Sequence, residues 1–306
     1  MSIIKIEDVT YIRYRAPDLD RMREFLSIFG MMEAASSRDA LFMRGRGDAP
    51  FIHWTEKGEA GVVCVGFRAA SIADLETLCR AVNGVIGPLT APGGGYFLRL
   101  QDPDGFVIEV VAGQQREQCL NEPDVIGWNS VAARRRVDTV KRLARGPAHV
   151  ERLGHYVVRV TDFSRSEAWY KEHLGLIVSD AIQLADGRTF GAFLRCDRGQ
   201  TPTDHHTVAL MQTGEPPGYH HSAYEVRDID DLMLGHDHLR SRGYAVDMGI
   251  GRHLLGSQVF TYWLDPWGQR LEHWTDGDLL TSAESPRKAE IDELRSTQWG
   301  VLAHSN

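Results

Sequence analysis

Hydrophobic and polar residues alternate along short segments of this chain, and each such segment is followed by a stretch with helical spacing. Residues 11–31, YIRYRAPDLDRMREFLSIFGM, begin as an alternating strand, reach Asp18 and continue as an amphipathic helix that ends at Gly30. Aspartate accepts hydrogen bonds from the free N–H groups at a helix start, and glycine tolerates the left-handed turn that ends it. The pattern therefore predicts a strand followed by a capped helix.

The same pattern returns in the second half of the chain. Residues 155–176, HYVVRVTDFSRSEAWYKEHLGL, follow the same order, with Asp162 and Gly175 as their landmarks. A second pair of segments, residues 63–84 and 220–243, again predicts a strand, a capped helix and a glycine stop. A third pair, DPDGFVIEV and DPWGQRLEH, is a tight turn followed by a strand. Because these landmarks keep their order, we interpret the chain as an internal duplication.

The duplication predicts an α+β protein of two domains, each built from paired βαβββ modules. A length of 306 residues suits two domains better than one core. We expect a first domain over residues 1–131, a linker over 132–151, a second domain over 152–280 and a tail over 281–306. The linker is basic and is expected to be helical up to a Gly-Pro pair. The tail is expected to form a helix and a loose end packed over the second domain.

Composition narrows the classes of protein to which the chain could belong. Its 42% hydrophobic and 25% charged residues are typical of soluble globular proteins. The formal net charge of −8 argues against a nucleic-acid partner, which needs clustered positive charge. The sequence has neither a signal-like start nor an apolar run of about 18 residues, so no membrane partner is expected. The four cysteines lack a paired spacing, which favours a cytoplasmic location and excludes a cysteine-built zinc site.

Two histidines and one glutamate fall at repeat landmarks of the second half. His155 starts its first strand, His221 lies on the strand before its second helix, and Glu272 follows the DPWG turn. A sheet of paired modules would bring the three together. Two neutral imidazoles and one carboxylate on one face of an ion leave the other face open, as in the two-histidine-one-carboxylate iron(II) sites. Strand histidines are often only hydrogen-bonded core residues, so this hypothesis depends on the whole set.

The first half of the chain serves as an internal control for that hypothesis. Its equivalent positions hold Tyr11, Cys64 and Glu109. A tyrosine, a cysteine and a single glutamate do not make a credible iron(II) site. We therefore expect a metal only in the second domain, with the first domain as a degenerate scaffold.

These motifs resemble those of the type I extradiol ring-cleavage dioxygenases of the vicinal oxygen chelate superfamily, which includes glyoxalase-like folds. Catechol 2,3-dioxygenases and dihydroxybiphenyl dioxygenases belong to this family. LGHYV and RLEHW match its metal-ligand motifs and imply His155 and Glu272 as ligands. In YHHSAYEV the family spacing implies His221 rather than His220. DHHTVAL is similar to the motif that carries a catalytic histidine, here His206.

The segment GRHLLGSQVFTYW matches the family's segment with a catalytic histidine and tyrosine, here His253 and Tyr262. The resemblance implies that this pair hydrogen-bonds the deprotonated diol, and that His206 stabilises activated oxygen and supplies a proton. It implies Fe(II) as the cofactor, with Mn(II) as the alternative ion. It also implies a dioxygenase of aromatic catabolism that inserts both atoms of O2 into a catechol-type diol, with cleavage beside the hydroxyls. Since family members are usually assemblies of identical subunits, we expect a homo-oligomer.

Two other functions stay open on the same fold. A metal-dependent glyoxalase or epimerase draws its ligands from two modules and needs more carboxylates. A metal-free binding protein of the drug-sequestering type needs no metal-ligand set at all.

Three further histidines adjoin the candidate site residues in sequence. They are His205, His220 and His273. Because neighbours on a strand point to opposite faces, we interpret all three as packing or solvent-facing residues.

Overall fold

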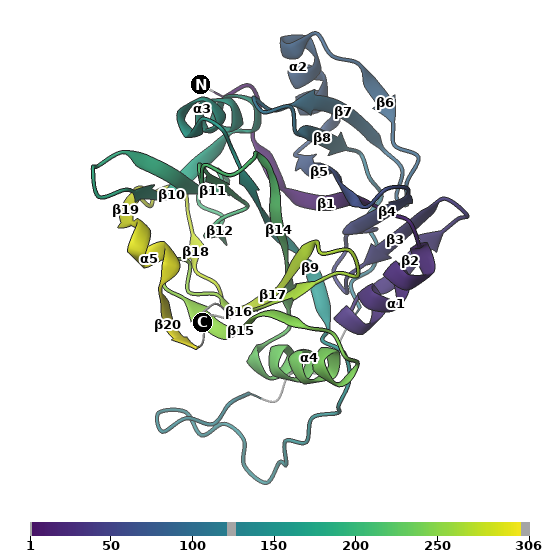
Figure 1. Cartoon of the computed structure of the whole chain (residues 1–306), viewed down its shortest axis with the longest axis vertical. Helices are drawn as coiled ribbons and strands as arrows, with labels where there is room; N and C mark the ends of the chain where they lie inside the picture. The colour runs from purple at the N-terminus through teal and green to yellow at the C-terminus, as the bar shows by residue number, and fades with distance from the viewer. Residues whose placement is uncertain (1, 121–126, 301–306) are drawn as a thin grey trace.

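The computed structural model describes residues 2–120 and 127–300, which form two sheet-rich halves (Figure 1). Each half contains two β-α-β-β-β modules, with one additional short strand inside the third module. This is the α+β arrangement of paired modules that the repeats predicted. The elements of the first half are β1 (Ile6–Ala16), α1 (Leu19–Phe29), β2 (Met32–Ser36), β3 (Ala40–Arg44), β4 (His53–Lys57), β5 (Gly61–Ala69), α2 (Ile72–Val82), β6 (Ile86–Pro88), β7 (Tyr96–Gln101) and β8 (Val107–Ala112).

The second half carries the candidate site and a carboxy-terminal extension of two strands and a short helix. Its first module and the strands within it are β9 (Val150–Arg159), α3 (Phe163–Leu174), β10 (Leu176–Gln183), β11 (Thr189–Cys196), β12 (Thr203–Asp204) and β13 (Val208–Met211). The remaining elements are β14 (Gly218–Val226), α4 (Ile229–Ser241), β15 (Val246–His253), β16 (Val259–Leu264), β17 (Arg270–Thr275), β18 (Leu279–Leu280), β19 (Arg287–Glu290), α5 (Ile291–Arg295) and β20 (Thr297–Gly300).

The first helix of each half begins and ends at the residues that the sequence predicted. The carboxylate of Asp18 accepts two backbone N–H groups at the start of α1, and that of Asp162 accepts one at the start of α3. Gly30 and Gly175 end these helices with φ of 112° and 69°. A Cβ at Gly30 would also lie 2.2 Å from the carbonyl oxygen of Ala148. Within the described ranges, no helix is long and apolar enough to cross a bilayer.

Strand order shows the duplication at the level of the sheets. The first sheet has eight strands in the order β2-β3-β4-β1-β5-β8-β7-β6. The second has ten, in the order β19-β10-β11-β13-β9-β14-β17-β16-β15-β20, beside a small pair of β12 and β18. The run β4-β1-β5-β8-β7 of the first sheet thus corresponds to β13-β9-β14-β17-β16 of the second. Buried side chains of both halves join in one hydrophobic core, so the second sheet is supported by the first half.

The prediction of a helical linker is wrong. The described residues 127–149 contain no helix, and the segment runs as a long loop below α4 before β9 begins at Val150 (Figure 1). Its apolar side chains Val137, Val140 and Leu143 are exposed. A short helix in water depends on packing of an apolar face, and this segment has no such contact to stabilise one.

The tail contains the predicted helix, α5, and up to residue 300 this helix is followed by the paired strand β20 rather than by a loose end. β19 pairs in parallel with β10, and β20 pairs antiparallel with β15. The tail therefore covers both edges of the second sheet and satisfies backbone groups that an edge strand leaves open. Residues 121–126 of the first predicted domain and 301–306 of the predicted tail lie outside the described residues.

Candidate metal centre

Three adjacent strands of the second sheet carry the predicted metal ligands. His155 lies on β9, His221 on β14 and Glu272 on β17. In the strand register, His155 is paired with Ala223, and Ala223 is paired with Glu272. Side chains of residues directly opposite one another on neighbouring strands project from the same face of a sheet. The small side chain of Ala223 therefore leaves an open space between the histidine and the glutamate.

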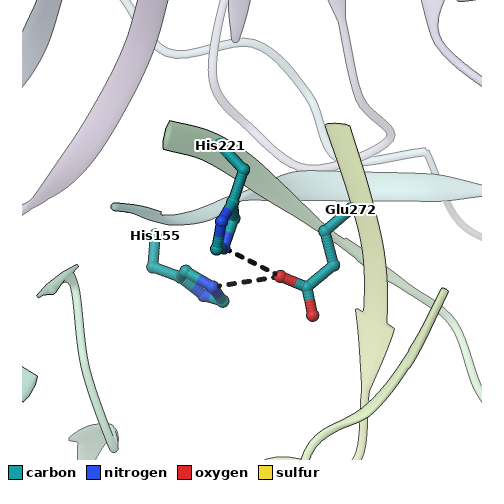
Figure 2. Close-up of side chains that lie close together, drawn as sticks. All are labelled: His155, His221 and Glu272. Atoms are coloured by element: carbon teal, nitrogen blue, oxygen red, sulfur yellow. Dashed lines mark ion pairs between the residues drawn. The ribbon is translucent and has the colours of Figure 1, made fainter. Parts of the chain in front are cut away.

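The three side chains point toward one another in this space (Figure 2). The Nε2 atoms of His155 and His221 each lie 3.3 Å from Oε2 of Glu272. One ligand atom from each residue lies within 4.8 Å of the other two, and all three residues are buried. Among the described residues, this is the group of histidine, cysteine and acidic side chains that meets the geometry of a metal site.

The donor atoms of this group lack ordinary hydrogen-bond partners. Nε2 of His221 and both carboxylate oxygens of Glu272 are buried without a hydrogen bond, because the contacts at 3.3 Å are not aligned as hydrogen bonds. Each unpaired buried polar group typically costs about 1–3 kcal/mol. A cation bound between these atoms would remove that cost, and the donor set is one that Fe(II) and Mn(II) accept. The residues present therefore fit a divalent metal ion.

The protonation states of the ligands also suit a metal. Burial lowers the pKa of His221 to about 4, so its imidazole is neutral at physiological pH, as metal binding requires. Burial opposes ionisation of Glu272, but the imidazoles of His155, His221 and His253 outweigh it and hold the pKa of this carboxyl well below its usual range. The site therefore presents a neutral imidazole at His221 and a carboxylate anion at Glu272.

The predicted catalytic histidine lies beside the first ligand. His206 precedes β13, and its ring packs against His155 and Phe193 with centroid distances of 4.1 and 4.5 Å. Burial lowers the pKa of His206 well below its usual value, which keeps the ring neutral. The structure thus brings His206 to the same centre as the metal-ligand set.

The predicted histidine–tyrosine pair lies on the other side of Glu272. Nε2 of His253 is 3.0 Å from the hydroxyl of Tyr262, and Tyr262 stands directly opposite Glu272 in the pairing of β16 with β17. Burial raises the pKa of the Tyr262 hydroxyl, so it stays protonated and able to donate a hydrogen bond. All six predicted residues therefore gather at one centre.

A cavity of about 300 Å³ opens onto this centre. Its polar lining includes two of the metal ligands and the three predicted catalytic residues. Away from these residues the lining is mainly apolar, formed by Val157, Phe190, Phe193, Met211, Leu254, Leu255, Ile291 and Leu294. The last two come from α5, so the tail forms one wall of the cavity.

Two of the histidines read as packing or solvent-facing residues are instead hydrogen-bonded to site residues. His205 is buried, with Nδ1 3.0 Å from Nδ1 of His206 and Nε2 2.7 Å from the carboxylate of Asp180. His220 places Nδ1 2.7 Å from Nδ1 of His221. The doubled histidines in DHHTVAL and YHHSAYEV were the available signal for both contacts. Asp180 had none, because it lies on the distant strand β10.

The first half fills the equivalent position with its own side chains. There Tyr11 and Glu109 stand in the places of His155 and Glu272. The hydroxyl of Tyr11 donates to Glu109 at 2.6 Å, and Arg99 donates to it at 2.5 and 3.1 Å. In the first half, a guanidinium and a phenol thus bind and neutralise the carboxylate of Glu109. Its counterpart in the second half, Glu272, faces the candidate metal site instead.

Comparison with known proteins places this architecture in a family. Residues 152–273 match the family described as Glyoxalase/Bleomycin resistance protein/Dioxygenase superfamily. The biphenyl-2,3-diol 1,2-dioxygenase of Paraburkholderia xenovorans is 31% identical over 283 residues, which are 88% of each protein. Metapyrocatechase 2 of Cupriavidus necator is 31% identical over 205 residues, 65% of this chain and 59% of that protein. The manganese-dependent 2,3-dihydroxybiphenyl 1,2-dioxygenase of Geobacillus genomosp. 3 is 27% identical over 282 residues, 88% of this chain and 85% of that protein.

Solved structures share the fold over the whole chain. Homoprotocatechuate 2,3-dioxygenase from Arthrobacter globiformis superposes with a TM-score of 0.79 at 20% identity, covering 99% of this chain and 91% of that one. A Mn(II)-bound glyoxalase from Novosphingobium aromaticivorans gives 0.78 at 22% identity, covering 97% and 92%. Fold and paired modules define a protein of the vicinal oxygen chelate class. Within that class, the chain belongs to the extradiol ring-cleavage dioxygenases, a family of metal-dependent oxidoreductases, which confirms the resemblance found in the sequence.

Proposed function

We propose that this extradiol dioxygenase binds a substituted catechol and O2 at a metal held by His155, His221 and Glu272. The observation that carries the proposal is the convergence of the three buried side chains beside an apolar cavity, with Nε2 of His221 and both carboxylate oxygens of Glu272 unpaired. Iron(II) is the proposed ion and manganese(II) the alternative, because the ligand set accepts either and one relative is described as manganese-dependent. The orphaned donors argue against a metal-free binding protein, and the single carboxylate in the group argues against a glyoxalase.

A bound divalent ion would bring the diol and O2 together and lower the pKa of the diol hydroxyls. Tyr262, with its hydroxyl protonated and hydrogen-bonded to His253, is placed to donate to the deprotonated diol oxygen and orient the ring. His206, on the other side of the ligand set, is placed to accept and return a proton during ring opening. A positioned acid or base of this kind typically contributes about 10²–10⁴-fold in rate.

The cavity favours a catechol whose ring substituent is apolar. His155, Val157 and Arg159 lie at alternate positions of β9 and all line the cavity. Moving along the strand from the candidate metal centre, the lining is therefore first apolar, at Val157, and then cationic, at Arg159. Phe193 and Met211 extend the apolar wall on the neighbouring strands. We infer that a monocyclic or biaryl catechol with an apolar substituent fits this cavity better than a catechol without a substituent.

Two properties of the protein as a whole stay predictions. All four cysteines are free thiols, which favours the reducing conditions of the cytoplasm. The homo-oligomer is expected from the family alone, and size measurement of the purified protein tests it.

The metal assignment is tested by Glu272→Gln, with Glu109→Gln as the matched control from the first half. Loss of an outer partner of a metal ligand typically lowers affinity about 10–100-fold, so loss of a ligand should lower it by at least as much. We expect Glu272→Gln to lose bound iron after anaerobic reconstitution, and with it O2 uptake and the yellow ring-opened product. Glu109→Gln should keep its iron. Full iron content and turnover in Glu272→Gln would show that the proposed site is wrong.

A further inference from the structure

A chain of buried hydrogen bonds leads away from the cavity behind His206. Nδ1 of His206 lies 3.0 Å from Nδ1 of His205, and Nε2 of His205 lies 2.7 Å from Oδ2 of Asp180. The three residues are 3%, 1% and 4% exposed, so water does not compete for these bonds. The chain thus joins the cavity lining to a carboxylate on β10.

The direction of each hydrogen bond follows from counting hydrogens. An ionised carboxylate only accepts, so the hydrogen between Asp180 and His205 belongs to Nε2 of His205. In a neutral imidazole the other nitrogen is then an acceptor, so Nδ1 of His205 accepts from Nδ1–H of His206. Nε2 of His206 is left without a hydrogen, as an acceptor available to the cavity that His206 lines.

We propose that Asp180 and His205 are positioning residues that hold the hydrogen of His206 on Nδ1 and share the proton that His206 takes from the diol. This inference rests on the proposed function of His206. In the transfer, a diol O–H bond breaks and an Nε2–H bond forms on His206. The Nδ1–H bond of His206 then breaks and an Nδ1–H bond forms on His205, which keeps its Nε2–H bonded to Asp180. The reverse transfers return the proton to the product.

The ring of His205 is held firmly enough for this role. Its backbone N–H donates to the carbonyl of Asp278 at 2.9 Å, and its carbonyl accepts from the hydroxyl of Ser179 at 2.6 Å. Gly256 packs against the ring, where a Cβ would lie 2.9 Å from Nδ1 of His205, and its φ of 79° suits glycine. Neighbours from three separate segments therefore fix the imidazole between its two partners.

The duplication indicates that these histidines serve the site rather than the fold. Strand register makes β4 of the first half equivalent to β13 of the second. Counting back from these strands, Pro50 and Phe51 stand where the second half has His205 and His206. The ring of Phe51 packs against Tyr11 with a centroid distance of 4.9 Å. The first-half module thus folds without either imidazole. His205 and His206 are present only in the half that carries the candidate metal ligands.

The tautomer of His206 tests the proposal directly, without turnover or bound metal. Long-range nitrogen–hydrogen NMR of histidine-labelled protein distinguishes Nδ1–H from Nε2–H, and loss of signals in His206→Gln assigns the ring. We expect Nδ1–H in the wild type. In Asp180→Leu no group accepts from Nε2–H of His205, so the hydrogen of His206 is no longer held on Nδ1 and an Nε2–H population of His206 should appear. Ser179→Ala removes the hydroxyl that donates to the carbonyl of His205 and accepts from the guanidinium of Arg195. It leaves the ring contacts of His205 with His206 and Asp180 in place, so the tautomer should be unchanged.

Kinetics supplies the second arm of the test. With metal content unchanged, Asp180→Leu should lower kcat by about 10²–10⁴-fold and change KM for the diol by less than about threefold, with partial recovery in Asp180→Glu. An Nε2–H tautomer in the wild type, or wild-type kcat in Asp180→Leu, would overturn the relay and leave the dioxygenase proposal standing. Absence of ring cleavage by the wild type would instead overturn the proposed function, while the NMR measurement still decides on the relay.

Discussion

At the scale of single residues, burial keeps three histidines of this protein neutral over most of the pH range. It lowers the pKa of His221 to about 4, that of His53 to about 3 and that of His273 to about 4. In the unfolded chain each imidazole returns to its usual value of about 6.5. Below that value the unfolded chain therefore binds more protons than the folded protein, and folding becomes less favourable as the pH falls.

His53 offers a test of this effect away from the metal centre, because it lies in the first half with its ring stacked on Tyr14 at 4.2 Å. Its folded pKa of about 3 lies below the unfolded 6.5, so the stability that the neutral ring contributes is lost as the pH falls through this window. We expect His53→Phe to reduce the slope of unfolding free energy against pH by up to about 1.4 kcal/mol per pH unit. Urea unfolding at several pH values measures this slope, and equal slopes in both proteins would contradict the prediction.

At the scale of elements, strand register decides which side chains share the metal-binding face. His155, Ala223, Glu272 and Tyr262 form one row across β9, β14, β17 and β16. Three positions of the row hold large polar side chains and one, Ala223, holds a methyl group, which lies between His155 and Glu272 where the proposed metal ion would bind. The strand register therefore shapes the site through Ala223, a residue whose side chain neither binds a ligand nor transfers a proton.

Enlarging that residue should close the site without removing a ligand. We expect Ala223→Val to lower metal affinity at least about 10-fold and to lower stability by about 1–3 kcal/mol, because the added methyl groups crowd a fully buried position. Ala209→Val, equally buried but on β13, controls for overpacking alone and should keep its metal. Iron titration with thermal unfolding separates the two effects. Equal metal affinity in both variants would show that the size of the side chain at position 223 does not limit metal binding.

At the scale of the whole molecule, the first half supports the ligand strands from behind. The hydroxyl of Tyr14 on β1 is 2.8 Å from that of Ser222, the residue that follows His221 on β14. Nε2 of His273, adjacent to the ligand glutamate on β17, is 2.7 Å from the carbonyl oxygen of Phe29. Two of the three ligand strands are thus hydrogen-bonded to the half that provides no ligands.

Removing one of these bonds should weaken the centre from a distance. Tyr14→Phe removes a hydroxyl that contacts both Ser222 Oγ, at 2.8 Å, and the Tyr219 hydroxyl, at 3.0 Å. We expect it to lower stability by about 0.5–1.5 kcal/mol for each hydrogen bond lost and to weaken iron binding as well. Tyr96→Phe, at an exposed position of β7, should change neither property. Denaturant unfolding and iron titration of the two variants provide the comparison. Unchanged iron affinity in a destabilised Tyr14→Phe would show that the first half supports the fold but not the site.

The sequence by itself determined the features that depend on local pattern and on repetition. Alternation, capping residues such as Asp18 and Gly30, and the repeated turns predicted paired modules, because these signals act within a few residues. Repetition then aligned His155, His221 and Glu272 with equivalent landmarks, and the structure brings them together. No isolated residue of the three would have sufficed.

Only the tertiary structure decided the features that depend on which faces meet. The partnership of Asp180 with His205 joins β10 to a loop after β12, and neither residue has a local pattern that encodes the other. The linker around Val140 stays non-helical, and the tail adds strands to both edges of the second sheet. Marginal helices and edge strands gain their stability from packing partners distant in the chain, and a sequence pattern read within one segment does not contain those partners.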